Sequence, residues 1–205
     1  MIYDISPLID ERIAVWPGDT NFSRAWQCQI KDGSNIDLST ITTTVHIGAH
    51  ADAPSHFHSD GVTIDRVAIE PYWGPCTVIT VRRRPLIMPE DVAPALAKGA
   101  RRILVRTDTQ PDRTVFPTDF SAFSPEAVRA MGAAGVVLIG IDTASVDPFS
   151  SKALPAHQEL YRCNIRNLEG LSLEHVPDGE YELVAIPLKL AGGDASPVRA
   201  VLRTR

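Results

Sequence analysis

The most regular pattern of apolar and polar residues lies between positions 40 and 52 of this 205-residue chain. One parity carries apolar or β-branched side chains, at Ile41, Thr43, Val45 and Ile47. The other parity is polar and ends in potential ligands, at His46, His50 and Asp52. Side chains alternate between the two faces of a strand, so this pattern predicts a β-strand with an apolar face and a histidine and carboxylate face. The β-branched residues at 40–45 also favour a strand.

Other segments predict a mixture of strands and helices. Strands are expected at 1–9 (with Ile2, Ile5 and Leu8 as apolar anchors), 22–31, 76–82, 102–107, 136–141, 181–190 and 198–202. Helices are expected at 89–98, at 124–135 with Ser124 as N-cap, and from Leu154 onward. The strands are too often adjacent for a regular βαβ array, so the predicted fold class is α/β with a curved, barrel-like mixed sheet and outer helices. No linker divides the chain, which predicts a single domain over residues 1–205.

Two turns bear on the chemistry. Trp16-Pro17-Gly18-Asp19 has proline and glycine where a type II turn needs them. A tryptophan presented there can cap the core or form a wall of an aromatic-binding pocket, and the residues alone leave both open. The Gly192-Gly193-Asp194 segment is interpreted as a turn, because no Gly-Lys-Ser/Thr element or following helix supports a phosphate-binding loop.

Charge and cysteine content narrow the possible partners. The net charge of −5 argues against nucleic acid or an anionic membrane as partner. The basic clusters Arg82-Arg83-Arg84 and Arg101-Arg102 are interpreted as strand ends or solvated faces. No segment approaches the roughly 20 apolar residues that span a bilayer, and the N-terminus does not resemble a signal peptide. The three cysteines are widely spaced and form no disulfide framework, which predicts a cytoplasmic protein.

The histidines after residue 45 predict a metal site. On a flat strand the Cα atoms of His46 and His50 would stand about 13 Å apart, too far to share an ion, so the chain must bend at Gly48. The two imidazoles and the Asp52 carboxylate then suit Zn²⁺, or less typically Mn²⁺. A single histidine is more often a satisfied polar group, but three with an intervening aspartate favour a ligand set. No cysteine is nearby, and His56 is left over, which favours a catalytic site over a structural one.

Five motifs give the chain a family resemblance. They are WPGD at 16–19, HIGAHADAPSHF at 46–57, DTASVDP at 142–148, LPAHQ at 154–158 and DASPVRAVL at 194–202. The second resembles the signature of the metal-dependent cyclase-like hydrolases, and the combination resembles their bacterial kynurenine formamidase (arylformamidase) branch. The resemblance covers nearly the whole chain, and it implies a swivelling β/β/α fold and a homodimer.

The resemblance also assigns distal site residues. It implies that His157 binds a second Zn²⁺ ion and that Asp52 and Glu169 bridge the two ions. On the residues alone, His157 is a histidine in the first turn of a helix and Glu169 a surface glutamate in a loop or turn after Leu168. His56 is expected to carry a proton, although its position also permits a further metal ligand, and the resemblance favours Trp16 as a contact for an aromatic substrate.

The expected activity is hydrolysis of N-formyl-L-kynurenine to L-kynurenine and formate, a step of tryptophan degradation. No Gly-x-Ser-x-Gly elbow occurs, which argues against a serine hydrolase. Two alternatives stay open. One is a cyclic-amide hydrolase of the isatin hydrolase type, and the other is a non-catalytic metal-binding protein for which His56 would be dispensable.

Overall fold

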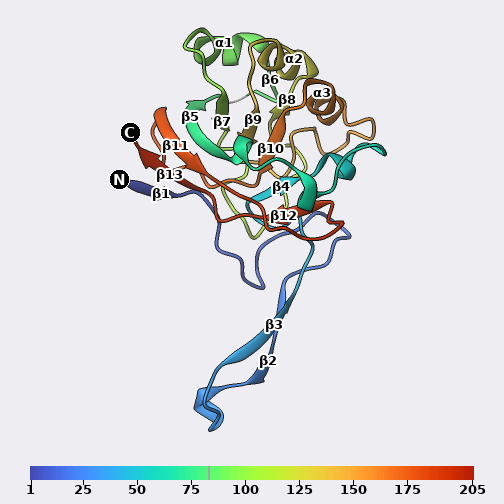
Figure 1. Cartoon of the computed structure of the whole chain (residues 1–205), viewed down its shortest axis with the longest axis vertical. Helices are drawn as coiled ribbons and strands as arrows, with labels where there is room; N and C mark the ends of the chain where they lie inside the picture. Colours follow the sequence, from blue (N-terminus) through green and yellow to red (C-terminus); the bar gives the residue numbers. More distant parts are fainter. Residues whose placement is uncertain (83) are drawn as a thin grey trace.

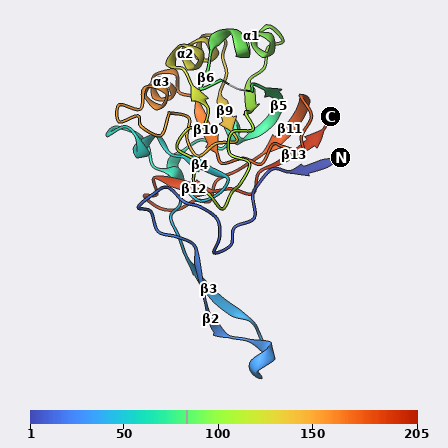
Figure 2. The ribbon, with the colours of Figure 1, turned by 180° about the vertical axis from the view of Figure 1, so that it is seen from behind.

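A strongly curved sheet and a long hairpin that projects from it dominate the structure (Figure 1). This computed structural model describes residues 1–82 and 84–205. Within those residues the main sheet has nine strands, in the order β1-β13-β11-β5-β7-β9-β10-β4-β12. The three α-helices gather on one side of this sheet, and the hairpin extends from the opposite end of the molecule (Figures 1 and 2).

The described strands have the following bounds: β1 Ile2–Asp4, β2 Ser23–Cys28, β3 Leu38–Thr42, β4 His50–Asp52, β5 Trp73–Thr80, β6 Leu86–Ile87, β7 Arg102–Arg106, β8 Ala122–Phe123, β9 Leu138–Ile141, β10 Arg166–Glu169, β11 Gly179–Val184, β12 Ala195–Pro197 and β13 Val201–Thr204. The helices are α1 Pro89–Ala97, α2 Pro125–Ala133 and α3 Pro155–Cys163, with short 3-10 turns η1 Ile30–Asp32, η2 Pro54–His56, η3 Ile64–Arg66 and η4 Glu70–Tyr72.

The centre of the sheet is parallel and its flanks are antiparallel. Strands β5, β7, β9 and β10 pair in parallel, and each successive pair is joined through one α-helix. The flanking pairs, β5 with β11 and β10 with β4, are antiparallel. Parallel neighbours need a crossover connection, and the α-helices provide it. Helix α2, for example, begins with Ser124 as its N-cap, whose side chain accepts a hydrogen bond from Ala127 N–H. The predicted mixed, curved sheet with outer helices is confirmed.

Side chains of the central strands are buried on both faces of the sheet. In β7, Ile103 and Val105 pack with the residues of the helices, whereas Leu104 packs inside the curve of the sheet. The neighbouring β9 is buried along its whole length, as the all-apolar run at 136–141 predicts. Both faces therefore hold core, and the polar site must lie where strands end.

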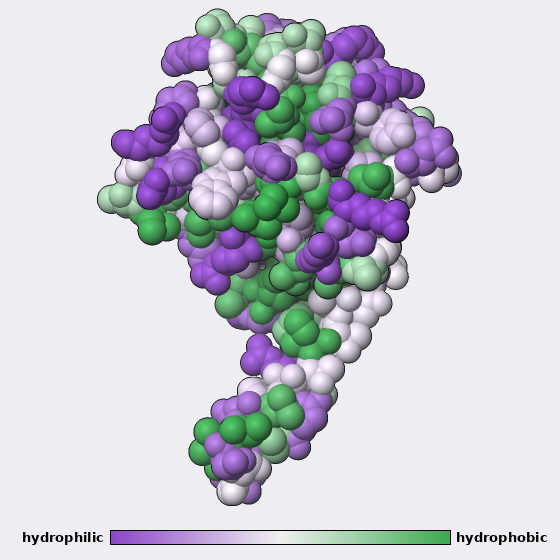
Figure 3. All heavy atoms as spheres, viewed as in Figure 1, coloured by the Kyte–Doolittle hydropathy of each residue, from purple (hydrophilic) through white to green (hydrophobic). Residues whose placement is uncertain are grey.

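The hairpin of β2 and β3, residues 23–42 and called here the arm, corrects the prediction for the start of the metal strand. Residues 40–42 are a strand, but its apolar face does not enter the core of the chain: Ile41 is 60% exposed. Trp26 on β2 is also exposed, and Figure 3 shows green, apolar side chains on the surface of the arm. The predicted strand also ends at Thr42: residues 43–49 lie outside any strand, and a strand resumes only in β4 at His50. The surface that would cover Ile41 is not in the described chain.

Two smaller predictions are corrected, whereas the prediction for Arg82 and Arg84 agrees with their exposure. Ile5 is buried as expected at the end of β1, but Ile2 and Leu8 are exposed. Arg102 is not solvated, because its guanidinium is buried against backbone carbonyls of η4 and donates to Pro71 O at 2.6 Å. In the other basic cluster Arg82 and Arg84 are exposed and form ion pairs, while Arg83 lies outside the described residues.

Candidate metal centre

The candidate site forms where β4 lies between β10 and β12. Register places His50 opposite Glu169 on β10, and Asp52 opposite Ala195 on β12. Glu169 is therefore the last residue of a buried strand, which corrects its assignment to a loop or surface position. His157 enters from the first turn of α3, as predicted. Residues more than 100 positions apart thus meet at one end of the sheet.

Two glycines shape the backbone around His46, His50 and Glu169. Gly48 has a φ of +57°, so the chain turns between His46 and His50 and brings their ring centroids to 5.1 Å. The predicted bend at Gly48 is confirmed. Gly170, with a φ of +66°, follows Glu169 and packs on the Gly48 carbonyl, where an added Cβ would lie 2.1 Å from the oxygen. Only glycine permits this backbone contact.

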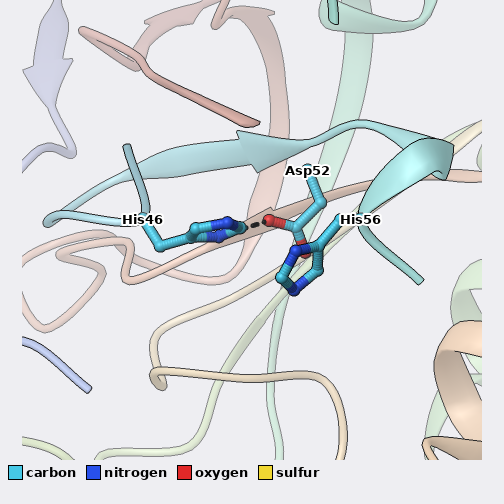
Figure 4. A group of neighbouring side chains, drawn as sticks. All are labelled: His46, Asp52 and His56. Carbon is cyan, nitrogen blue, oxygen red and sulfur yellow. Dashed lines mark ion pairs between the residues drawn. The ribbon is translucent and has the colours of Figure 1, made fainter. Parts of the chain in front are cut away.

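The side chains of five predicted site residues converge in one buried cluster. Asp52 Oδ1 lies 3.1 Å from His46 Nδ1 and 3.5 Å from His50 Nε2, whereas Asp52 Oδ2 faces His157 Nε2 at 3.4 Å. Glu169 repeats this arrangement, with Oε2 at 3.4 Å from His50 and Oε1 at 3.4 Å from His157. Each carboxylate therefore directs one oxygen to His50 and the other to His157. Figure 4 shows His46 in contact with Asp52.

Further hydrogen bonds hold these side chains in place. His157 Nδ1 donates to Asp147 at 2.7 Å, and His50 Nδ1 lies 3.0 Å from the Gly48 carbonyl. Asn167 donates to Asp52 at 2.7 Å and to Glu169 at 3.2 Å. With Nδ1 occupied in both histidines, each Nε2 is directed into the cluster. This is the arrangement expected of histidines that bind a metal through Nε2.

Two observations show that the cluster fits metal ions. His50 Nε2 and Asp52 Oδ1 are buried without a hydrogen-bond partner among the described residues, a costly arrangement that a cation between them would relieve. The nitrogen and oxygen atoms also stand 3.1–3.5 Å apart. Two ligand atoms at 2.0–2.2 Å from one tetrahedral ion are separated by about 3.3–3.6 Å. Nitrogen and carboxylate donors of this kind suit Zn²⁺ or Mn²⁺.

The electrostatics of the cluster favour cations. Burial acts to lower the pKa of His46, but contacts with the Asp52 and Asp194 carboxylates outweigh it and raise that pKa to about 9. Burial likewise acts to lower the pKa of His157. The Asp147, Asp52 and Glu169 carboxylates outweigh it and raise that pKa well above its usual value. The carboxylates thus favour a positive charge in the buried cluster, either on the histidines or on a bound cation.

His56 lies beside the cluster, on the 3-10 turn that follows β4 (Figure 4). Its ring centroid is 4.2 Å from that of His46, and its side chain is 35% exposed. Burial is the main cause that lowers its pKa, with the Asp52 charge acting in the opposite direction. One nitrogen of His56 comes within 4.8 Å of ligand atoms of His46 and Asp52, so the structure leaves both a ligand and a proton carrier open.

A cavity of about 530 Å³ opens onto these residues, within the roughly 300–1,000 Å³ of small-molecule sites. His46, His50, His56, His157 and Glu169 line one part of it. Trp16 also lines it, and the turn that carries Trp16 has the predicted type II form, with Gly18 at φ +101° and an Asp19 N–H bond to Trp16 O. Trp16 packs edge-on against Phe116, with ring centroids 5.2 Å apart, and in a tilted arrangement against Phe149, with centroids 5.1 Å apart.

The sequence reasoning missed three polar residues of the site. Asp194 Oδ2 is 3.0 Å from His46 Nε2 and 3.6 Å from His56 Nδ1, although its segment was interpreted only as a turn. Asp147 hydrogen-bonds to His157, and Asn167 hydrogen-bonds to Asp52 and Glu169, as described above. Asp147 and Asp194 fall inside two of the family motifs, which was the available signal. Asn167 had none, because its alternation with Glu169 is meaningful only once β10 is known.

Comparison with known proteins identifies the family. A family model named Cyclase, described as "Putative cyclase", matches residues 3–148. The chain belongs to the Cyclase family. Within it, the chain is 45% identical over 203 residues to the kynurenine formamidase of Delftia acidovorans, covering 98% of this chain and 97% of that relative. The kynurenine formamidase of Bordetella pertussis matches to the same extent.

Solved structures of Cyclase relatives share the fold. A structure titled as a potential metal-dependent hydrolase with cyclase activity superposes with a TM-score of 0.83 at 27% identity, covering 98% of this chain and 96% of the other. Isatin hydrolase A from Labrenzia aggregata has a TM-score of 0.86 at 24% identity, covering 100% and 94%. At that identity the isatin hydrolase likeness concerns the fold alone. The predicted family resemblance and swivelling fold are confirmed.

Proposed function

We propose that this protein hydrolyses N-formyl-L-kynurenine to L-kynurenine and formate, as an arylformamidase of tryptophan degradation. The observation that carries the proposal is the 45% identity to kynurenine formamidases over 98% of the chain. The buried cluster supports it, because amide hydrolysis needs a site that activates water and stabilises negative charge on the carbonyl oxygen. The chain acts in this proposal as one cyclase-like hydrolase domain, residues 1–205.

The proposed cofactor is a pair of Zn²⁺ ions per chain, with Mn²⁺ as an alternative. His46, His50 and Asp52 would hold the first ion and His157 the second, with Asp52 and Glu169 shared between them. The two oxygens of each carboxylate, directed to opposite histidines, support this sharing. Bound metal would supply a lowered pKa for water and electrostatic stabilisation of the developing oxyanion.

The residues of the chain would divide the remaining work. Water adds to the formyl carbon, the carbon–nitrogen bond breaks, and the arylamine nitrogen takes up a proton. His56 is proposed to deliver that proton, since it faces the cavity beside the cluster and remains accessible to solvent. Trp16 would contact the aromatic ring of the substrate, and its packing on Phe116 and Phe149 fixes its position.

The arm supports the proposal of a homodimer. A two-stranded hairpin is at best marginally stable alone in water, and this one exposes Trp26, Ile36, Leu38 and Ile41. Burial against a second copy would cover these side chains. Sedimentation velocity should give twice the chain mass, and Ile41→Glu should shift the protein toward monomer. A monomeric wild-type protein would reject the dimer.

The proposed location is the cytoplasm. The three cysteines are free thiols, which fits a reducing compartment. No helix among the described residues has the length and apolar character needed to cross a membrane.

A chelator assay tests the activity. Purified protein should consume N-formyl-L-kynurenine, measured by its absorbance, lose turnover after metal removal, and regain it on addition of Zn²⁺ or Mn²⁺. Isatin serves as the alternative substrate in parallel. Faster opening of isatin would favour the cyclic-amide hydrolase, and full metal binding without turnover of either substrate would favour the non-catalytic protein.

A further inference from the structure

The cavity contains a cation that the metal centre does not use. Arg113 is the one arginine or lysine among the described residues that line the cavity. The other ionisable lining groups are histidines and carboxylates, which include Asp19, Glu169 and Asp194. Arg113 therefore offers an anionic part of a ligand a permanently charged side chain that the metal centre does not use.

Within residues 1–82 and 84–205 the guanidinium of Arg113 has no carboxylate partner. It is partly buried, and its one hydrogen bond within the described chain runs from Nη2 to the Leu171 carbonyl. No carboxylate oxygen among residues 1–82 and 84–205 lies within 4.0 Å of it. Burial lowers its pKa, with Asp142 and Glu174 opposing the shift from a distance. Buried charges in proteins are generally paired, so a partly buried cation without an anion is unusual and suggests that a ligand supplies one.

A second group in the same loop also lacks a partner. Gln110 is buried and lines the cavity, and its Oε1 has no hydrogen-bond partner within the described residues. An unsatisfied amide costs free energy unless a ligand completes it. A guanidinium donor and an amide acceptor on one loop match the two charged groups of an α-amino acid, the carboxylate and the ammonium.

The same loop also supplies part of the aromatic wall. Arg113 O accepts a hydrogen bond from Ala14 N at 2.8 Å, which ties the loop to the segment that carries Trp16. Phe116, three residues after Arg113, packs on Trp16 with centroids 5.2 Å apart. One short stretch of chain therefore positions both a ring-binding surface and a cation.

We propose that Arg113 binds the α-carboxylate of an amino-acid substrate and that Gln110 accepts a hydrogen bond from its α-ammonium group. This inference rests on the proposed formamidase activity. It explains how the protein would select aryl formamides that carry an amino-acid group. The metal centre acts on the formamide, and the Arg113 loop distinguishes N-formyl-L-kynurenine from aryl formamides without the charged end.

Two substrates that differ only in this end provide the test. N-formyl-L-kynurenine carries the amino-acid group, and N-formyl-2-aminoacetophenone keeps the aryl formamide and ketone without it. For Arg113→Gln, the ratio of kcat/KM for the first substrate to that for the second should fall about 10- to 100-fold, mainly through KM, because a hydrogen bond to a charged group is lost. Arg113→Lys should restore part of the ratio. Arg199→Gln, at an exposed arginine paired with Asp4, is the matched control.

Calorimetry keeps the inference testable if a variant folds poorly. Wild-type protein should bind L-kynurenine at least about tenfold more tightly than 2-aminoacetophenone, which lacks the amino-acid group. Equal affinities, or an unchanged substrate ratio in folded Arg113→Gln, would overturn the inference. If the wild-type protein hydrolyses neither formamide, the proposed activity is wrong, and the calorimetric comparison then decides on the carboxylate site by itself.

Discussion

Replacing Asp147 with asparagine should weaken metal binding without removing any proposed ligand. The Asp147 carboxylate is fully buried and accepts three hydrogen bonds, from Ala156 N at 3.0 Å, His157 N at 3.0 Å and His157 Nδ1 at 2.7 Å. The last of these makes Nδ1 the donor to Asp147, so Nε2 is the nitrogen that faces Asp52 and Glu169. Asparagine keeps one acceptor oxygen and places an amide NH₂ group at the other position. In one orientation this NH₂ group faces His157 N and Nδ1, and in the flipped orientation it faces Ala156 N.

The magnitude follows from these contacts. Loss of the charge and of an acceptor position should cost about 2–4 kcal/mol of unfolding free energy. For a chain of this size the midpoint of thermal unfolding of metal-free protein should fall by roughly 4–16 °C. Because His157 is then free to rotate or change tautomer, metal affinity should fall roughly 10- to 100-fold.

Thermal unfolding of metal-free protein and competition with a chelator measure the two effects. Asp32→Asn, an exposed aspartate on the arm, is the matched control and should change neither. If Asp147→Asn binds metal as tightly as Asp32→Asn does, then Asp147 does not orient a ligand, and His157 is not held in the way the hydrogen bonds indicate.

Three further substitutions separate the proposed roles. Glu169→Gln should lower the metal content below two ions per chain and nearly abolish turnover, and elemental analysis showing full occupancy with normal activity would remove Glu169 from the site. Trp16→Ala should weaken binding of the aryl substrate by about 1–3 kcal/mol, which raises KM, and should leave the metal content unchanged. An equal effect on a small aliphatic formamide would show that Trp16 supports the fold instead. His56→Asn should keep its metal and lose roughly 10²–10⁴-fold in kcat, whereas loss of metal would make His56 a ligand.

Local patterns predicted the parts of the fold that local physics determines. The Ser124 cap, the turn at Trp16 and the bend at Gly48 each depend on a few neighbouring residues, and all three are present. The alternation at 40–47 correctly indicated a strand only as far as Thr42, because the chain leaves β3 there and bends before β4 begins at His50. It could not indicate which surface covers Ile41, because that depends on tertiary or quaternary contacts.

The missed site residues share a different cause. Asp194 meets His46 across 148 positions, and Asn167 meets Asp52 across 115. Spacing in the sequence carries no information about such pairs until the strand order of the sheet is known. Glu169 was found only through family resemblance for the same reason, and its place at the end of β10 comes from pairing with β4.

The contact between Gly48 and Gly170 has a consequence for judging sequence variants of this protein. Alanine is the mildest replacement for glycine by chemical similarity, and neither glycine donates a side chain to the cluster. At position 170, however, a methyl group would meet the Gly48 oxygen at 2.1 Å, so the two backbones would have to separate by about 1 Å to reach normal contact. The separation of the segments that carry His50 and Glu169 therefore depends on the lack of a Cβ atom at position 170. A scoring scheme based on side-chain similarity would rank Gly170→Ala as benign, although the substitution would change the spacing between His50 and Glu169.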